Sequence, residues 1–174
     1  IGFTRTLPKA APTAKKPKSP GILAIDHFDY EKNELASINN AYQRKPSAAT
    51  VSRLPTKDNS TQGNVLKIQY QKGAEGWCGY YTVLHPLGAG YLDASKYQYV
   101  SFKVKGGKGG ELFDTGMADE VWDKKGDSLK AGPITQYLSN GVSSEWQEVV
   151  IPLRDFGSLD LKTLHAFIRD SKRM

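Results

Sequence analysis

The sequence predicts an all-β domain built as a sandwich of two antiparallel sheets. Apolar and polar residues alternate with a period of two in several short segments, which is typical of half-buried strands. Gly, Pro, Asn and Asp residues separate these segments and mark turns. No segment carries the longer period of a convincing amphipathic helix. Because one face of such a sheet is apolar, it needs a second sheet to cover it.

Length and composition fit one globular domain. The chain has 174 residues, of which 39% are hydrophobic, and this is enough to build a core. No apolar run approaches the roughly 20 residues that span a membrane. The single cysteine, Cys78, excludes an internal disulfide and a cysteine-based metal cluster.

The net charge of +6 comes mostly from the first 20 residues, which hold five basic side chains and no acidic one. The other 19 basic side chains are balanced by 18 acidic ones. The folded part therefore lacks the basic excess of a nucleic-acid-binding domain, and we expect no nucleic-acid partner.

The composition changes near residue 21. Residues 8–20 are rich in Pro, Ala and Lys and have no periodicity, which is typical of a linker or a disordered arm. The predicted organisation is an arm at residues 1–20 followed by a sandwich domain at residues 21–174.

The first predicted strands are short apolar or alternating runs. Residues 22–25 are continuously apolar, and the polar segment 31–63 is expected to form loops with short strands around residues 48–54. Residues 66–70 alternate strictly, and residues 77–84 form a longer strand.

The clearest strand signal lies in residues 97–119, which we interpret as a hairpin. Two alternating strands flank the sequence Gly-Gly-Lys-Gly-Gly at residues 106–110, which supplies the backbone freedom of a turn. This run resembles a phosphate-binding loop only superficially, because it joins two strands and lacks the Gly-Lys-Ser/Thr ending. The apolar face of the hairpin should enter the core with Val100, Phe102, Val104, Phe113 and Met117.

The last third of the chain predicts four more elements. We expect strands at residues 134–138, 146–153 and 166–168, and a helical turn at residues 159–164. Trp77 and Trp146 are interpreted mainly as core anchors, although the glycines beside Trp77 would also let it project at a rim.

Several motifs in this order resemble one family of modules. They are Asp-x-Phe-Asp at residues 26–29, Gly-Trp-x-Gly at 76–79, Leu-Asp-Ala-Ser-Lys-Tyr at 92–97, Val-Ser-Phe-x-Val-Lys-Gly at 100–106, Gly-Gly-Glu-x-Phe-x-x-Gly-x-x-Asp at 109–119 and Glu-Trp-Gln-x-Val-x-Ile-Pro-Leu at 145–153. The set resembles the galactose-binding-like jelly rolls of non-catalytic carbohydrate-binding modules, especially family 11, and the related CIA30-like domains. The resemblance covers residues 22–169.

The resemblance implies a jelly-roll β-sandwich that binds a polysaccharide or oligosaccharide as an accessory module, with a catalytic domain as a neighbour. It also implies an exported protein, either secreted, periplasmic or on the cell surface. Such modules usually end in one further strand beside the first one, which this sequence lacks before Met174. Either the final strand is missing from the sequence, or Ile1–Leu7 of this or another copy covers that edge. Two other functions stay open, a protein-interaction domain of CIA30-like type and a small glycan-active enzyme.

Aromatic side chains away from the predicted core are the candidate glycan contacts. Sugar rings stack their C–H faces on flat aromatic rings, and polar neighbours bind their hydroxyls. The alternative is that the tyrosines cover a sheet edge or pack under loops, and that Asp114 lies on a solvated face. The candidate ligand-binding residues are Tyr80, Tyr91, Tyr97, Tyr99, Asp114 and Trp122.

Catalytic and metal-binding functions have weaker support in the sequence. No pair of carboxylates is fixed across a cleft as a glycosidase requires, and the three histidines have no metal spacing and no Ser or Cys partner, so we expect no catalytic site. No cofactor is required. Related modules hold a structural calcium near the first strand, where Asp26, Asp29 and Asn33 carry suitable oxygens, although their spacing is not that of an EF-hand.

Overall fold

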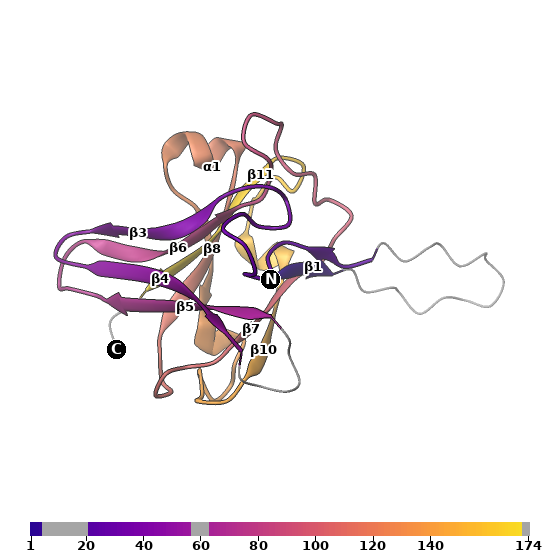
Figure 1. Cartoon of the computed structure of the whole chain (residues 1–174). Helices are drawn as coiled ribbons and strands as arrows, with labels where there is room; N and C mark the ends of the chain where they lie inside the picture. Colours follow the sequence, from indigo (N-terminus) through magenta and orange to yellow (C-terminus); the bar gives the residue numbers. More distant parts are fainter. Residues whose placement is uncertain (5–20, 57–62, 172–174) are drawn as a thin grey trace.

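The computed structural model describes residues 1–4, 21–56 and 63–171. Within these residues the chain forms eleven strands, one short α-helix and two 3₁₀ helices (Figure 1). They are β1 (Gly2–Thr4), β2 (Leu23–Ala24), β3 (Asn39–Arg44), β4 (Ala48–Pro55), β5 (Asn64–Gln71), β6 (Trp77–Val83), β7 (Tyr99–Val104), β8 (Phe113–Asp119), α1 (Glu120–Lys125), β9 (Leu129–Pro133), η1 (Ile134–Gln136), β10 (Gln147–Pro152), η2 (Leu153–Phe156) and β11 (Leu164–Ser171).

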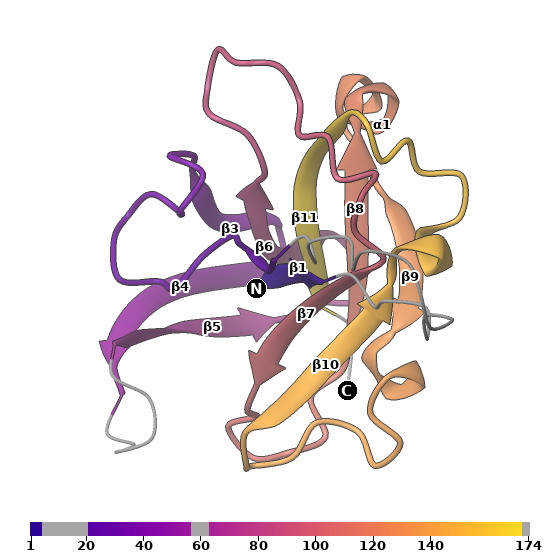
Figure 2. The same ribbon diagram turned by 90° about the vertical axis from the view of Figure 1, so that its right-hand side faces the viewer.

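The strands form two main antiparallel sheets, which confirms the predicted β-sandwich. One sheet has the order β10-β7-β1-β2 and the other the order β3-β6-β11-β8-β9. Figure 2 shows β7 and β10 crossing the direction of β8 and β11 in the other sheet. None of the helices in the described part of the chain is long and apolar enough to cross a membrane.

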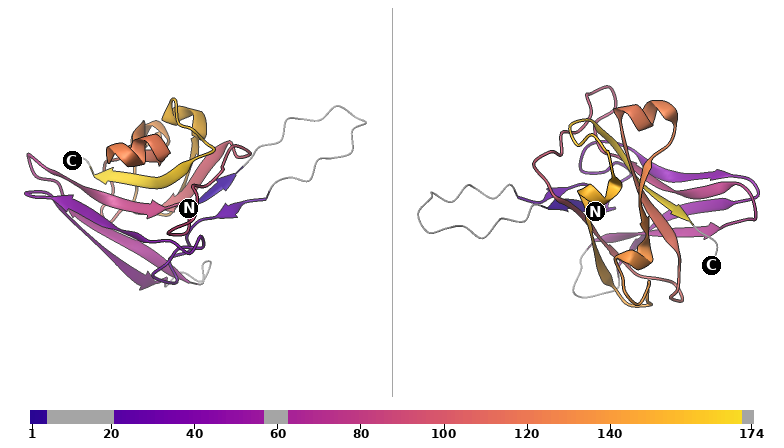
Figure 3. Two further views of the ribbon diagram at one scale, coloured as in Figure 1. Left: turned by 90° about the horizontal axis from the view of Figure 1, so that it is seen from above. Right: turned by 180° about the vertical axis from the view of Figure 1, so that it is seen from behind.

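The third sheet is the β4–β5 hairpin, which lies beside β3 and β6 and below them in Figure 3. Arg53 of β4 donates to Asn39 of β3 at 2.9 Å. The Tyr70 hydroxyl of β5 donates to the carbonyl of Leu112 at 3.2 Å, and the Arg169 guanidinium of β11 lies 5.6 Å from the Tyr70 ring. These contacts place the hairpin against the inner face of the five-stranded sheet. There it extends the layer that the four-stranded sheet forms over that face.

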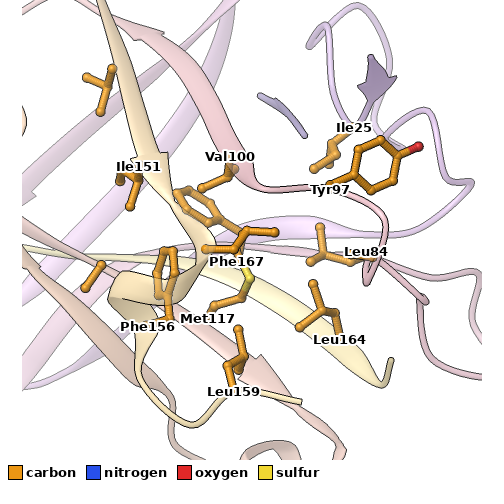
Figure 4. Close-up of a cluster of buried hydrophobic side chains, with 14 of the residues drawn as sticks. Ile25, Leu84, Tyr97, Val100, Met117, Ile151, Phe156, Leu159, Leu164 and Phe167 are labelled. Atoms are coloured by element: carbon orange, nitrogen blue, oxygen red, sulfur yellow. The ribbon is translucent and has the colours of Figure 1, made fainter. Parts of the chain in front are cut away.

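The core lies between the two main sheets (Figure 4). Phe102 of β7 packs on Phe167 of β11 with their ring centroids 5.7 Å apart. The predicted core residues Val100, Phe113 and Met117 are fully buried, and Phe102 and Val104 pack against them. Burial of large apolar side chains contributes about 1.5–3 kcal/mol each, so this cluster is the main source of stability.

The prediction of a hairpin at residues 97–119 is wrong, although its core face is right. β7 pairs with β10 and β1, whereas β8 pairs with β11 and β9. The glycine-rich segment therefore carries the chain from one sheet to the other. An alternating pattern shows which side chains face the core, but it does not show whether the next strand pairs or crosses over.

The glycine-rich segment binds a carboxylate of its own chain. The backbone N–H of Lys108 donates to Oε1 of Glu111 at 3.0 Å. Burial raises the pKa of Glu111, but the backbone amides of Lys108, Gly107 and Gly109 outweigh it and hold the pKa below its usual value. The amides of this loop thus surround a side chain that belongs to the fold, which agrees with a structural loop rather than a phosphate site.

The N-terminal residues lie inside the smaller sheet. Gly2–Thr4 pairs with β2 on one side and with β7 on the other, and the backbone N–H of Ile25 donates to the Ile1 carbonyl at 3.0 Å. This part of the segment Ile1–Leu7 therefore covers a sheet edge, as expected, and it does so within one chain. The linker-like residues 8–20 lie outside the described residues.

Local predictions for the last third of the chain were partly wrong. The expected strand at residues 134–138 is the 3₁₀ helix η1, and the expected helical turn at residues 159–164 is irregular. Trp146 is 41% exposed and does not anchor the core. The sequence reading missed β3, β9 and α1, because these elements are polar and are held by their neighbours rather than by apolar periodicity.

Candidate functional site

A groove of about 680 Å³ lies on the face of the five-stranded sheet that is turned away from the core. Its floor is made by alternate residues of β3, β6, β11, β8 and β9, and its wall is made by α1 and the turn after it. The lining consists of Tyr42, Lys72, Trp77, Cys78, Tyr81, Asp114, Ala118, Asp123, Gly126, Asp127, Ser128, Lys130, His165, Ala166, Ile168 and Asp170.

Three aromatic side chains occupy the β3–β6 half of the groove. Trp77 is 50% exposed, and the Arg44 guanidinium lies 4.6 Å from its ring. The Tyr42 and Tyr81 rings are 6.4 Å apart and tilted by 45°. An exposed tryptophan beside two half-buried tyrosines is a surface that a flat apolar ligand face can cover.

Two glycines let neighbouring side chains lie across the floor of the groove. Gly79 of β6 is the register partner of Tyr42, and a Cβ at Gly79 would come within 2.6 Å of the Tyr42 hydroxyl. A Cβ at Gly116 of β8 would come within 3.2 Å of the Lys130 ammonium. The missing side chains thus leave the room in which Tyr42 and Lys130 lie.

The β8–β9 half of the groove is polar. The ammonium group of Lys130 in β9 binds the carboxylate of Asp170 in β11 across the intervening strand β8, and it also donates to Ser128 Oγ at 2.9 Å. Asp114 of β8 is the register partner of Asp170. In total the groove lining holds four aspartates, two lysines and one histidine, so carboxylates are in excess.

Burial raises the pKa of Asp170 to about 6. We expect carbon-13 NMR to show this carboxyl titrating near pH 6, against about 3.9 for an unperturbed aspartate. Between these two values the folded chain binds more protons than the unfolded chain, so this group makes the protein more stable as the pH falls from 7 to 4. Asp170→Asn should remove that part of the pH dependence. A midpoint at or below 4 would show that the Lys130 ion pair outweighs burial.

A second polar cluster closes one end of the groove. The ring of His165 contacts a carboxylate oxygen of Asp123 in α1, with Nε2 and Oδ1 3.1 Å apart, and its Nδ1 lies 3.0 Å from Nε2 of His85. Tyr91 donates to the other oxygen of Asp123 at 3.2 Å. Burial lowers the pKa of His165, while the Asp123 charge opposes this effect.

Helix α1 is positioned by the buried carboxylate of Asp119. Its Oδ1 accepts from the backbone N–H groups of Val121 and Trp122, both at 3.0 Å, and its Oδ2 accepts from that of Asp160 at 2.8 Å. This is an N-cap that also ties the helix to the segment before β11. It therefore sets where Asp123 stands in the wall of the groove.

The structure buries two of the predicted contact residues. Tyr80 is 2% exposed and faces inward, where burial raises its pKa, and Tyr97 is 8% exposed and belongs to the core cluster. The expectation that they lie on open faces is wrong. Both faces of β6 carry aromatic residues, so alternation alone could not tell that Trp77 and Tyr81, not Tyr80, point away from the core.

The other predicted residues are spread over the surface. Asp114 lines the groove. The Tyr91 hydroxyl donates to Asp123, which forms part of the end wall of the groove, so Tyr91 lies behind that wall. Tyr99 lies on the outward face of the smaller sheet, where its register partner is Pro152. Trp122 is half-buried on α1 under the Lys125 ammonium, 4.4 Å from its ring, and does not line the groove.

Sequence reasoning did not single out Tyr42, Tyr81, Lys130 and Asp170 as site residues. One signal was present. Trp77, Gly79 and Tyr81 are alternate residues of one strand and therefore lie on the same face. A glycine between two exposed aromatic residues on one face indicates that another group approaches the sheet closely at that point.

The oxygens considered for calcium are used by the protein itself. Oδ1 of Asp26 accepts from Phe28 N–H at 2.7 Å and its Oδ2 accepts from Asn39 at 2.7 Å. Oδ1 of Asn33 accepts from the backbone of Leu35 and Ser37. Asp29 accepts from the backbone of Asn64 at 2.9 Å. These three residues therefore do not converge on a common ion, and we do not assign a calcium site to them.

The β-sandwich fold, with a groove lined by aromatic and acidic side chains across one sheet, agrees with the class of carbohydrate-binding modules. Residues 25–168 match the family described as carbohydrate binding domain 30. The chain belongs to this family. Among curated proteins, none matches it.

Solved structures of such modules share the fold. The family 30 module of the cellulosomal cellulase Cel9D-Cel44B of Clostridium thermocellum is 22% identical, with 83% of this chain and 86% of that chain covered and a TM-score of 0.56. Another family 30 module is 25% identical, with 71% and 66% covered and a TM-score of 0.54. The family 11 module of Clostridium thermocellum in complex with a β-1,3-1,4-mixed-linked tetrasaccharide is 18% identical, with 83% and 84% covered and a TM-score of 0.59.

Proposed function

We propose that this module binds a neutral glycan chain, without cleaving it, in the groove of the five-stranded sheet. The observation that carries the proposal is the arrangement of Trp77, Tyr81 and Tyr42 along one half of the groove and of carboxylates along the other. Apolar surface with a few placed polar groups is how small-ligand sites generally bind.

The two halves of the groove would have different roles. The rings of Trp77 and Tyr81 stack on the C–H faces of sugar units. Asp114 and Asp170 accept hydrogen bonds from sugar hydroxyls, and Lys130 donates to ring or hydroxyl oxygens while it stays paired with Asp170. Stacking supplies most of the affinity, and the polar groups set the orientation of the chain.

The charge of the groove favours neutral sugars. Four aspartates against two lysines in the lining would repel a polyuronate, whereas hydroxyl groups are good partners for carboxylates. A mixed-linked β-glucan is our first candidate ligand, because a family 11 module with the same fold is known in complex with such a tetrasaccharide.

The carboxylates of the groove do not suit hydrolysis. A glycosidase places two carboxyl groups on opposite sides of the scissile bond. Asp114 and Asp170 are instead register partners on adjacent strands of one floor, and Asp170 is held by Lys130. We therefore assign the module an accessory role next to a catalytic domain, in an exported protein like the cellulosomal cellulases that carry its structural relatives.

Calorimetry and affinity electrophoresis test the proposal. We expect soluble mixed-linked β-glucan to bind and to retard the protein in the gel, while polygalacturonate has no effect at the same salt concentration. Incubation of the protein with the glucan should release no reducing ends. Absence of binding across a panel of neutral glucans, xylans and mannans, or preferential binding of the polyuronate, would overturn it.

A further inference from the structure

The end cluster of the groove contains an unusual contact between two imidazole rings. Nε2 of His85 and Nδ1 of His165 face each other at 3.0 Å. His85 follows strand β6, and His165 is the residue at the β-bulge of β11, between Leu164 and Ala166. Bulges often re-aim a side chain next to a functional site.

The three polar contacts of the two rings outnumber the two N–H protons that two neutral imidazoles carry. In the tautomers in which Nε2 of His165 donates to the Asp123 carboxylate and Nδ1 of His85 donates to the Pro86 carbonyl at 3.1 Å, each of these nitrogens carries a proton. The two remaining nitrogens then present lone pairs to each other. In this arrangement a cation, either a third proton or a metal ion, can lie between the facing nitrogens and satisfy both lone pairs.

We propose that His85 and His165 bind a divalent transition-metal ion of the zinc class between His85 Nε2 and His165 Nδ1. Two zinc–nitrogen bonds of about 2.0–2.1 Å in a tetrahedral site place their nitrogens roughly 3.3 Å apart. The facing nitrogens are 3.0 Å apart, so the rings need to separate by a few tenths of an ångström and to turn until both lone pairs point at the ion. Asp123 and Pro86 act as the outer hydrogen-bond partners that fix the ring tautomers, as in zinc sites generally.

The surroundings of the pair suit an open site with two protein ligands. The side chain of His165 is 24% exposed, and the Tyr91 ring packs edge-on against His85 with centroids 5.2 Å apart. Among the described residues, no group of three or more His, Cys, Asp or Glu side chains is arranged to hold a metal ion. Water would complete the coordination, and this proposal does not depend on glycan binding.

Titration of the metal-free full chain with zinc chloride tests the proposal. We expect one zinc ion per chain in calorimetry, and in nitrogen-15 spectra of the histidine rings we expect shifts at His85 Nε2 and His165 Nδ1. His85→Gln should weaken zinc binding at least about tenfold, and Asp123→Asn about 10- to 100-fold by loosening the outer partner. His27→Gln is the matched control, because His27 is exposed and should leave the affinity unchanged.

The nitrogen-15 spectra of the histidine rings in the unmodified chain test the zinc proposal even if a variant folds poorly. Unchanged His85 and His165 nitrogens in 1 mM zinc chloride would overturn the proposal and would leave a shared proton as the positive species. Zinc binding that persists in a folded His85→Gln variant would overturn it as well.

Discussion

Trp77→Ala is expected to lower glycan affinity by about 10- to 100-fold. Trp77 is 50% exposed in the free module, and its ring is available to cover a sugar face. Burying a large aromatic side chain contributes roughly 1.5–3 kcal/mol, and 1.4 kcal/mol corresponds to a factor of ten in affinity. Calorimetry with mixed-linked β-glucan would measure the loss. Tyr81→Ala should have an effect of similar size, because Tyr81 lies in the same half of the groove.

Trp146→Ala provides a matched control. Trp146 is 41% exposed, close to the exposure of Trp77, but it precedes β10 in the other sheet and does not line the groove. Its loss should change the affinity by less than twofold. Equal effects of the Trp77 and Trp146 substitutions would place the binding site elsewhere. Tyr99→Ala, on the outward face of the smaller sheet, should also leave the affinity unchanged.

Asp119→Ala is expected to cost about 2–4 kcal/mol of unfolding free energy. Loss of an N-cap costs about 1 kcal/mol, and the part-buried backbone N–H of Asp160 would lose its acceptor, at about 1–3 kcal/mol. For a chain of this size the melting temperature should fall by roughly 5–12 °C. Thermal denaturation followed by circular dichroism would measure it. Glycan affinity should fall as well, because α1 holds Asp123 in the groove wall.

Two variants separate the cap from a general effect of removing a carboxylate. Asp119→Asn keeps one oxygen for Val121 and Trp122 but loses the acceptor for Asp160, so it should lie between the native chain and Asp119→Ala. Asp127→Ala removes an exposed carboxylate two residues beyond α1 that accepts one hydrogen bond, from the backbone N–H of Ser128 at 2.7 Å, and should cost no more than about 1 kcal/mol. A variant Asp119→Ala as stable as Asp127→Ala would contradict the role of the cap.

Much of the fold could be predicted because core burial leaves a local signature. Val100, Phe113 and Met117 are apolar at alternate positions, and all three are fully buried between the sheets. The order of strands in the sheets had no such signature. β7 and β8 are joined by a short glycine-rich segment yet pair with strands that are distant in the sequence, and this pairing depends on contacts across the whole chain.

The all-β class, the alternating faces and the presence of aromatic and acidic side chains suited to sugars follow from the amino-acid sequence alone. Which face each side chain occupies depends on how the layers pack. In β6, Tyr80 and Tyr81 are equally apolar neighbours, but the β4–β5 hairpin lies over one face of the strand and leaves the other open. A period of two separates the faces of a strand, and only the layer packed above it determines which of them is buried. The groove proposed for glycan binding lies on the face that was left uncovered.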